Sequence, residues 1–153
     1  MEIAMYKHIL VPTDGSDLAG KGVQQGLALA KALGARVTVV TATEPFPVSG
    51  FALGAGWVPS GADMQEFSAA QKEDAEKILA AVKAEAAKAG VDADLVHVPD
   101  QRAADAILEA AKVHKADLIV IASHGRRGVE RVLLGSQTAE VLAHSTIPVL
   151  VVK

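Results

Sequence analysis

The sequence predicts a single three-layer α/β domain over residues 1–153, with a five-stranded parallel sheet between layers of helices. Five short apolar runs, several of them rich in β-branched residues, alternate with segments whose apolar residues recur at helical spacing. The chain is 50% hydrophobic but only 3% aromatic, so its core has to consist of Val, Leu, Ile and Ala. This composition is typical of layered α/β proteins rather than of aromatic-rich β-sandwiches.

The first third of the chain predicts a β-α-β unit. Residues 8–11 (HILV) form a short apolar run that the turn sequence PTDGS ends, which indicates a buried strand. Ser16 or Asp17 can cap the following helix, and Gly34 stands where a left-handed residue ends one. Residues 37–41 (VTVVT) are β-branched throughout and favour a second strand. Such a unit implies parallel strands joined by a right-handed crossover.

Residues 44–60 interrupt this alternation with prolines, glycines and most of the aromatic side chains of the chain. A loop of this length in a compact domain is often a lid or a partner surface. Phe46, Phe51 and Trp57 are therefore candidates for covering a ligand. The interpretation we favour is local packing of these rings over the edge of the sheet.

The rest of the chain continues the alternation of helices and strands. The long charged segment 63–89 has one apolar face and one solvated face, and Gly90 ends it. The remaining predicted elements are a strand at 95–98, a helix at 102–114, a strand at 118–121, a short helix through Val141 and Leu142, and a strand at 147–152.

Two small-residue turns follow the fourth strand. The first contains Gly125 and Gly128, and the second, Gly135 and Ser136, directly precedes a helical pattern, with Ser136 as its expected N-cap. The order strand, glycine loop, helix start is the one that builds an anion site, because glycines let the backbone approach a phosphate. Glycines after a strand also occur in sharp turns that bind nothing.

At these residues the chain resembles the universal stress protein family. The nucleotide-binding members carry a glycine, two residues, a glycine, nine residues, then a glycine and a serine or threonine. On this chain the pattern falls on Ala122, Gly125, Gly135 and Ser136, so that Ala122 replaces the first glycine. The first strand with its acidic turn and the last strand also match, so the resemblance covers most of the chain.

The resemblance implies a Rossmann-like fold of the adenine-nucleotide alpha-hydrolase type with strand order 3-2-1-4-5. In such a sheet the ligand crevice lies at the carboxyl ends of the strands where the order reverses. Thr13 and Asp14, after the first strand, would then face residues 122–128 across one crevice. Two signals that are far apart in the sequence would meet there.

The leading hypothesis is binding of an adenine nucleotide, ATP with Mg²⁺, by a cytoplasmic stress-response switch. The resemblance places adenine near the backbone of Pro12 and Thr13 and near Val40, after the second strand. It places the phosphates near the backbone N–H groups of the later turn. Asp14 would accept from the ribose or join a magnesium shell; the alternative is that it only accepts a local backbone N–H. The predicted nucleotide-binding residues are Pro12, Thr13, Asp14, Val40, Ala122, His124, Gly125, Arg126, Arg127, Gly128, Gly135, Ser136 and Gln137.

The alanine at position 122 has three possible consequences. If the backbone there needs a positive φ, alanine costs about 1–2 kcal/mol. If the position needs only space, the methyl group crowds the phosphate, and if it is ordinary strand, alanine is harmless. The roles of Arg126 and Arg127 are also undecided at the level of sequence, since each can contact phosphate or lie in solvent.

The second hypothesis is a dimeric interaction scaffold that binds no nucleotide. On either hypothesis we expect a homodimer through the last strand, from Ile147 to Val152, because a long apolar edge strand invites pairing with its copy. A net charge of −3 gives no case for nucleic-acid binding, and no apolar run is long enough to span a membrane.

A dedicated enzyme has the least support in the sequence. There is no cysteine, and the five histidines show no pair at metal-ligand spacing on one helix. Ser123 and His124 are adjacent, so we expect them to point to opposite faces of a strand rather than to form a nucleophile–base pair. Slow hydrolysis of bound ATP is compatible with the sequence, but no residue stands out as its general base.

Overall fold

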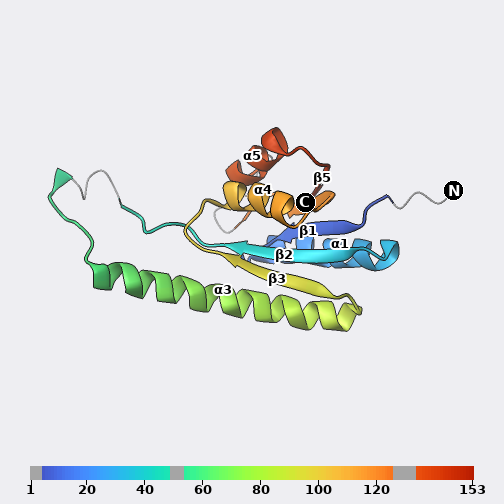
Figure 1. Ribbon diagram of the computed structural model, residues 1–153, viewed down its shortest axis with the longest axis horizontal. Helices are drawn as coiled ribbons and strands as arrows, with labels where there is room; N and C mark the ends of the chain where they lie inside the picture. The colour runs from blue at the N-terminus through green and yellow to red at the C-terminus, as the bar shows by residue number, and fades with distance from the viewer. Residues whose placement is uncertain (1–4, 49–53, 126–133) are drawn as a thin grey trace.

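The computed structural model describes residues 5–48, 54–125 and 134–153. Within these residues the strands form one parallel sheet in the order β3-β2-β1-β4-β5 (Figure 1), which confirms the predicted Rossmann-like fold and its strand order. The strands are β1 (His8–Pro12), β2 (Arg36–Ala42), β3 (Ala93–Val98), β4 (Leu118–Ala122) and β5 (Val149–Val152).

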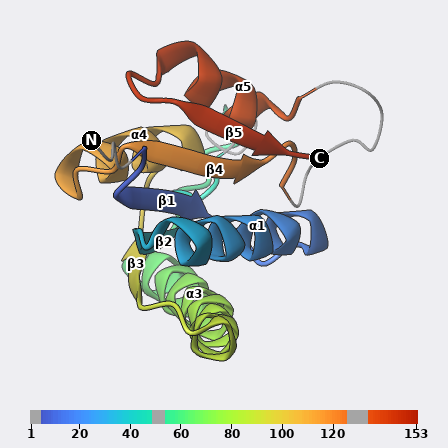
Figure 2. The same cartoon turned by 90° about the vertical axis from the view of Figure 1, so that its right-hand side faces the viewer.

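Helices cover both faces of the sheet (Figure 2). α1 and α3 pack on one face, and α4 and α5 pack on the other. The long helix α3 runs beside β3 and extends past the carboxyl ends of the strands (Figure 1). The helices are α1 (Asp17–Leu33), α3 (Gly61–Ala89), α4 (Ala103–Val113) and α5 (Ser136–His144).

The helix ends follow the capping signals of the sequence. Ser16 is the N-cap of α1, where its hydroxyl oxygen accepts from Ala19 N at 3.2 Å, and Gly34 ends the helix at a φ of 66°. α3 begins at Gly61, two residues earlier than predicted, because Ser60 is its N-cap and forms a reciprocal capping box with Asp63.

Alternation along the strands divides the core into two layers. Leu118 and Val120 of β4 pack toward α1 and α3, whereas Ile119 and Ile121 pack toward α4 and α5. All four side chains are buried, which explains the continuous apolar run that predicted this strand.

One glycine brings α1 close to the sheet. A Cβ on Gly26 would lie 2.5 Å from Cγ2 of Val11 in β1, so a side chain here would push the helix away. The start of α1 is thereby held over the carboxyl end of β1.

Two expectations differ from the structure. The last strand begins at Val149 rather than Ile147, because Pro148 has no N–H for the ladder and the Ser145 hydroxyl bonds both the N–H and the carbonyl of Ile147. Phe46 does pack locally, against Trp57 and Phe67, but over the start of α3 instead of the sheet edge. Phe51 lies outside the described residues.

Candidate functional site

A pocket of about 470 Å³ lies at the carboxyl end of the sheet, where the strand order reverses on either side of β1. It gathers residues from both halves of the chain. Arg126, Arg127 and Gly128 lie outside the described residues. Every other predicted site residue lines the pocket: Pro12, Thr13, Asp14, Val40, Ala122, His124, Gly125, Gly135, Ser136 and Gln137.

The turn after β1 is fixed to β2 by hydrogen bonds. Thr13 N donates to the carbonyl of Val40 at 2.9 Å, and the Thr41 hydroxyl donates to the carbonyl of Thr13 at 2.6 Å. Val40 therefore lies within β2 rather than after it, since the strand continues to Ala42, and its carbonyl is already used. What Val40 offers the pocket is an apolar wall.

Asp14 uses its two carboxylate oxygens in different ways. Oδ1 accepts from Ser16 N at 2.9 Å, so the local role left open by the sequence does exist. Oδ2 lies so close to Gly125 that a Cβ built on that glycine would collide with it. Asp14 and Gly125 are 111 positions apart in the chain and face each other across the pocket. The absence of a side chain at Gly125 is what makes room for the carboxylate.

The start of α5 corrects one sequence prediction. The N-cap is Gly135, not Ser136, and its own N–H donates to the carbonyl of Ser123 at 2.8 Å. The sequence predicted that Gly135 donates its N–H to a ligand. It cannot do so, because this N–H is already bonded to Ser123. Because glycine has no side-chain oxygen, it leaves the N–H groups of Ser136, Gln137 and Thr138 without a capping side chain at the pocket wall.

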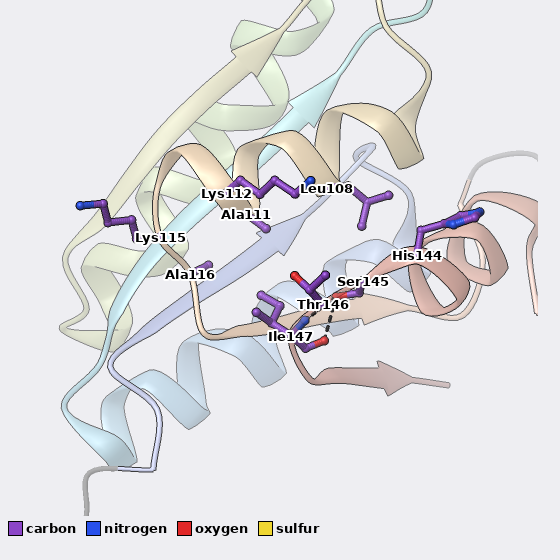
Figure 3. A pocket seen from close by; sticks show the side chains of 9 residues that line it. All are labelled: Leu108, Ala111, Lys112, Lys115, Ala116, His144, Ser145, Thr146 and Ile147. Atoms are coloured by element: carbon purple, nitrogen blue, oxygen red, sulfur yellow. Dashed lines mark hydrogen bonds between the residues drawn. The ribbon is translucent and has the colours of Figure 1, made fainter.

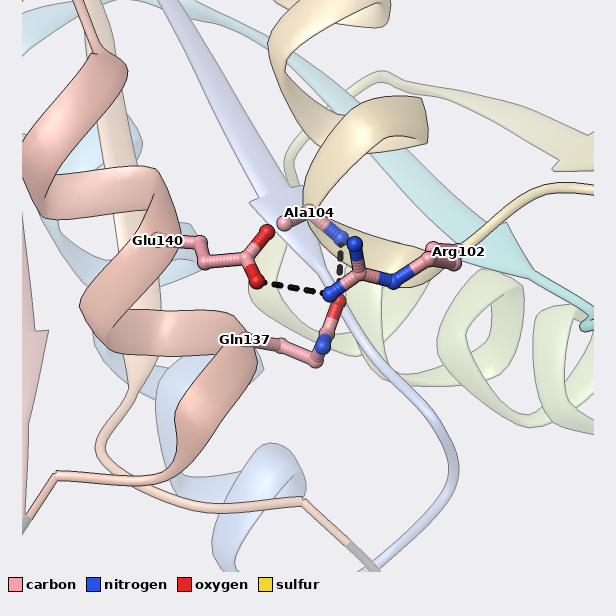
Figure 4. Close-up of polar contacts among 4 residues, drawn as sticks. All are labelled: Arg102, Ala104, Gln137 and Glu140. Atoms are coloured by element: carbon pink, nitrogen blue, oxygen red, sulfur yellow. Dashed lines mark hydrogen bonds and ion pairs between the residues drawn. The ribbon is translucent and has the colours of Figure 1, made fainter.

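Side-chain contacts hold the starts of α4 and α5 together beside the pocket (Figure 4). The Gln137 side-chain oxygen accepts from Ala104 N at 2.8 Å and so caps α4, whose own N-cap residue makes no side-chain bond. Arg102 and Glu140 form an ion pair at 2.6 Å, and this bond raises the pKa of Arg102. Gln137 thus contributes a side chain to the scaffold as well as a backbone N–H to the pocket.

Ala122 occupies ordinary strand geometry. It is the last residue of β4 and pairs with Val152, and its carbonyl accepts from the buried hydroxyl of Thr138 at 2.8 Å. Its methyl group faces α1, where a Cβ on Gly22 would lie 3.7 Å away. The first of the three alternatives is excluded, because Ala122 lies in β4 without a positive φ, and Gly22 on the facing helix leaves room for its methyl group.

Ser123 and His124 are hydrogen-bonded, contrary to the sequence prediction. The Ser123 hydroxyl and Nδ1 of His124 are 3.1 Å apart. The argument from strand alternation fails because β4 ends at Ala122 and the chain has already turned. Ser123 is buried, whereas His124 lines the pocket, so the pair is not arranged as an exposed nucleophile with its base.

The sequence reasoning missed the part of the pocket wall that comes from α3 and from the end of β2. Three of these residues, Gln71, Asp74 and Ile78, recur at helical spacing on one face of α3, which is the signal that was available. With Asp14, the carboxylates of Glu44 and Asp74 make this side of the pocket acidic. The additional lining residues include Thr41, Thr43, Glu44, Gln71, Asp74, Ile78, Ile107 and Thr138.

Other polar groups of the molecule lie outside this pocket. His97 bonds the Thr43 hydroxyl through Nε2 at 2.8 Å, and burial lowers its pKa. Within the described ranges, no three metal-ligating side chains are grouped so that they could hold an ion. In the same residues, none of the helices has the length and apolar character that crossing a bilayer requires.

A second cavity of about 310 Å³ lies between the final turns of α4 and α5 (Figure 3). Lys112, Lys115 and His144 stand at its rim, near the carbonyl ends of the two helices, where cationic side chains are favoured. No predicted site residue lines it.

Comparisons with known proteins agree over nearly the whole chain. Residues 5–153 match the model of the universal stress protein family. A universal stress protein of Thermus aquaticus is 40% identical over 150 residues, covering 97% of this chain and 100% of the relative. One of Methanocaldococcus jannaschii is 35% identical over 152 residues, covering 97% and 83%. A universal stress protein solved in complex with cAMP has a TM-score of 0.70 at 29% identity, covering 97% of each chain.

Proposed function

The chain belongs to the universal stress protein family, and we propose that it binds an adenine nucleotide, ATP together with Mg²⁺, in the pocket at the carboxyl end of the sheet. The observation that carries this proposal is the meeting of Asp14 and Gly125 across that pocket. A carboxylate from one half of the chain faces the glycine turn from the other half. The universal stress protein solved with cAMP, 29% identical to this chain, supports the adenine nucleotide as the ligand class.

The pocket offers different groups to the parts of a nucleotide. The Pro12–Val40 side is apolar and backbone-fixed, which suits the flat face of a base. The N–H groups of Ser136 and Gln137 at the start of α5 suit phosphate oxygens, because the helix dipole favours an anion there and no side chain caps these donors in the described residues. Asp14 is suited to the ribose hydroxyls between them.

The acidic wall of the pocket favours a nucleotide that carries its own cation. Asp14, Glu44 and Asp74 all line the space into which the ligand has to fit. A magnesium ion on the phosphates reduces the repulsion between these carboxylates and the ligand. When bound, Mg²⁺ would neutralise phosphate charge, and Asp14 would be the residue to join its shell if it does not accept from the ribose.

We propose that occupancy of this pocket reports nucleotide levels to a partner, so that the protein acts as a cytoplasmic stress-response switch. The pocket wall joins α3, α4 and α5, which are separate surface elements, so a ligand here contacts all of them. Among the described residues around it, the hydrogen-bonded pair Ser123–His124 has a buried hydroxyl and is not arranged as an exposed nucleophile with its base, so we propose a switch rather than a dedicated enzyme.

The test begins with protein purified without added nucleotide, denatured, and analysed for released small molecules by mass spectrometry. We expect ATP or ADP close to one per chain, or, if the protein is empty, saturable binding of Mg-ATP by calorimetry. Asp14→Ala should weaken that binding by at least about tenfold, the size of one charge-assisted hydrogen bond. A flat titration of empty wild-type protein would end the nucleotide proposal.

The dimer is a separate proposal that rests on β5. This strand lies at the edge of the sheet, with β4 on one side, and Leu150 is 43% exposed. An apolar edge of this kind invites a second copy to pair along it. The same dimer is also expected if the protein is an interaction scaffold that binds no nucleotide. Sedimentation at micromolar concentration should give twice the chain mass, and a monomer would contradict the pairing.

A further inference from the structure

His124 is among the predicted nucleotide-binding residues, but neither its contact with the ligand nor the purpose of its hydrogen bond to Ser123 has been assigned above. We infer that His124 donates a hydrogen bond from Nε2 to a phosphate oxygen of the bound nucleotide, and that Ser123 is the positioning residue that fixes the ring for it. This inference deepens the proposed nucleotide binding and rests on it.

The position of the ring follows from contacts on two of its edges. Nδ1 is 3.1 Å from the Ser123 hydroxyl. On another edge, the ring atom Cδ2 lies 3.6 Å from the place of a Cβ on Gly135, the N-cap of α5. Because Cδ2 is bonded to Nε2, the free ring nitrogen lies near the start of α5. His124 also lines the pocket, so Nε2 and the N–H groups of the first helical turn serve the same space.

The proton is expected on Nε2 because Ser123 is buried. Only 5% of Ser123 is exposed, and within the described part of the chain His124 Nδ1 is the partner of its hydroxyl. A buried hydroxyl that does not donate loses a hydrogen bond, so Ser123 donates to Nδ1 when the ring is neutral. The neutral ring then carries its proton on Nε2 and can donate into the pocket.

Protonation keeps this geometry and adds a charge. In the imidazolium form Nδ1–H donates to the Ser123 oxygen, since a hydroxyl can accept as well as donate. Nε2–H is therefore a donor in both protonation states, and in the imidazolium form it is a charged donor. Hydrogen bonds from charged donors to phosphate are roughly twice as strong as neutral ones.

Charged side chains on several other elements line the pocket or lie on the elements around it. Asp14 faces Gly125 from the β1–α1 turn, and the pocket is also lined by Glu44, which follows β2, and by Asp74 of α3. Glu140 of α5 forms an ion pair with Arg102, which precedes α4. Lys153 follows Val152 of β5, whose carbonyl accepts from Ser123 N. Carboxylates titrate well below, and lysine and arginine well above, the interval of about pH 5 to 8.

The first arm measures the affinity for cAMP between about pH 8 and pH 5.5, because its phosphodiester charge is constant over this range whereas terminal phosphates titrate. Wild-type affinity should rise about three- to tenfold as the pH falls. His124→Gln keeps an amide donor near the place of Nε2 but cannot gain a proton, so its affinity should not change with pH. His144→Gln, on an exposed histidine outside the pocket, should behave as wild type. A wild-type affinity that is flat in pH, or a His124→Gln slope equal to it, overturns the inference.

The second arm measures the ring itself and needs no nucleotide. Nitrogen-15 NMR of the free protein at about pH 8 should show His124 as a single tautomer with its proton on Nε2. Ser123→Ala should give a mixture of tautomers and weaken cAMP binding at this pH. A proton on Nδ1 in wild type overturns the role of Ser123. If no nucleotide binds at all, the proposed function fails, and the NMR spectra alone decide whether Ser123 fixes the ring.

Discussion

The two ends of β1 both place an aspartate against backbone, with opposite results. At the amino end, Asp117 accepts from Lys7 N at 2.9 Å and from His8 N at 3.0 Å, and its own N–H donates to the carbonyl of His8. The Asp117 carboxylate therefore satisfies the backbone N–H groups at the start of β1. At the carboxyl end, Asp14 bonds locally through one oxygen and turns the other toward Gly125 across a pocket.

The difference follows from the direction of the chain. In a parallel sheet with helical crossovers, helices begin at the carboxyl ends of the strands, so free N–H groups gather there. α1 and α5 both begin beside the pocket. At the other end the helices finish, and their carbonyl groups do not favour an anion. The same residue type is therefore structural at one end of β1 and suited to binding at the other.

The largest effect should come from filling the space between the two halves of the pocket. Gly125→Ala places a methyl group against the Asp14 carboxylate, which then has to move. Calorimetry should show nucleotide affinity reduced by about tenfold or more. The matched control is Gly20→Ala, where a Cβ meets nothing within 4 Å. It should leave affinity unchanged and stabilise α1 by about 0.5–1 kcal/mol. Equal affinities of the two variants would mean that the Asp14–Gly125 contact has no role in binding.

The next largest effect concerns the amino end of β1, where Asp117 bonds the backbone. Asp117→Ala leaves two backbone N–H groups without their acceptor, so the free energy of unfolding in urea should fall by about 1–3 kcal/mol. Asp94→Ala is the control, because its ion pair with Arg36 is exposed, and it should cost less than about 1 kcal/mol. Nucleotide affinity should survive in both. A loss of affinity in Asp117→Ala, measured on folded protein, would erase the contrast between the two ends.

The smallest effect is a dependence of stability on pH. Burial, and then the nearby charge of Arg36, lower the pKa of His8, whose Nε2 lies 2.7 Å from the Thr38 hydroxyl. The unfolded chain therefore binds a proton more readily than the folded one, and stability falls as the pH drops below about 6.5. Urea unfolding at about pH 8 and pH 5.5 should show a smaller fall in His8→Gln than in wild type. An identical fall in the two proteins would assign the dependence to another group, such as His97.

The sequence was sufficient for the elements and for the two halves of the pocket. The apolar run of β4 and the caps at Ser16 and Gly34 are local signals, since a helix cap depends on residues within one turn. The turns at Asp14 and Gly125 were identified separately, and topology brought them together because the carboxyl ends of adjacent parallel strands meet at one edge.

Only the tertiary structure decided how the residues at that edge are used. The first-turn N–H groups of α5 have no capping side chain because the N-cap is Gly135, and Gln137 caps a different helix, α4. The methyl group of Ala122 turns toward Gly22, and α3 reaches the pocket with Gln71 and Asp74. The spacing of residues along the chain does not encode these contacts. They depend on the angles at which helices pack on the sheet and on which backbone groups the packing leaves unpaired.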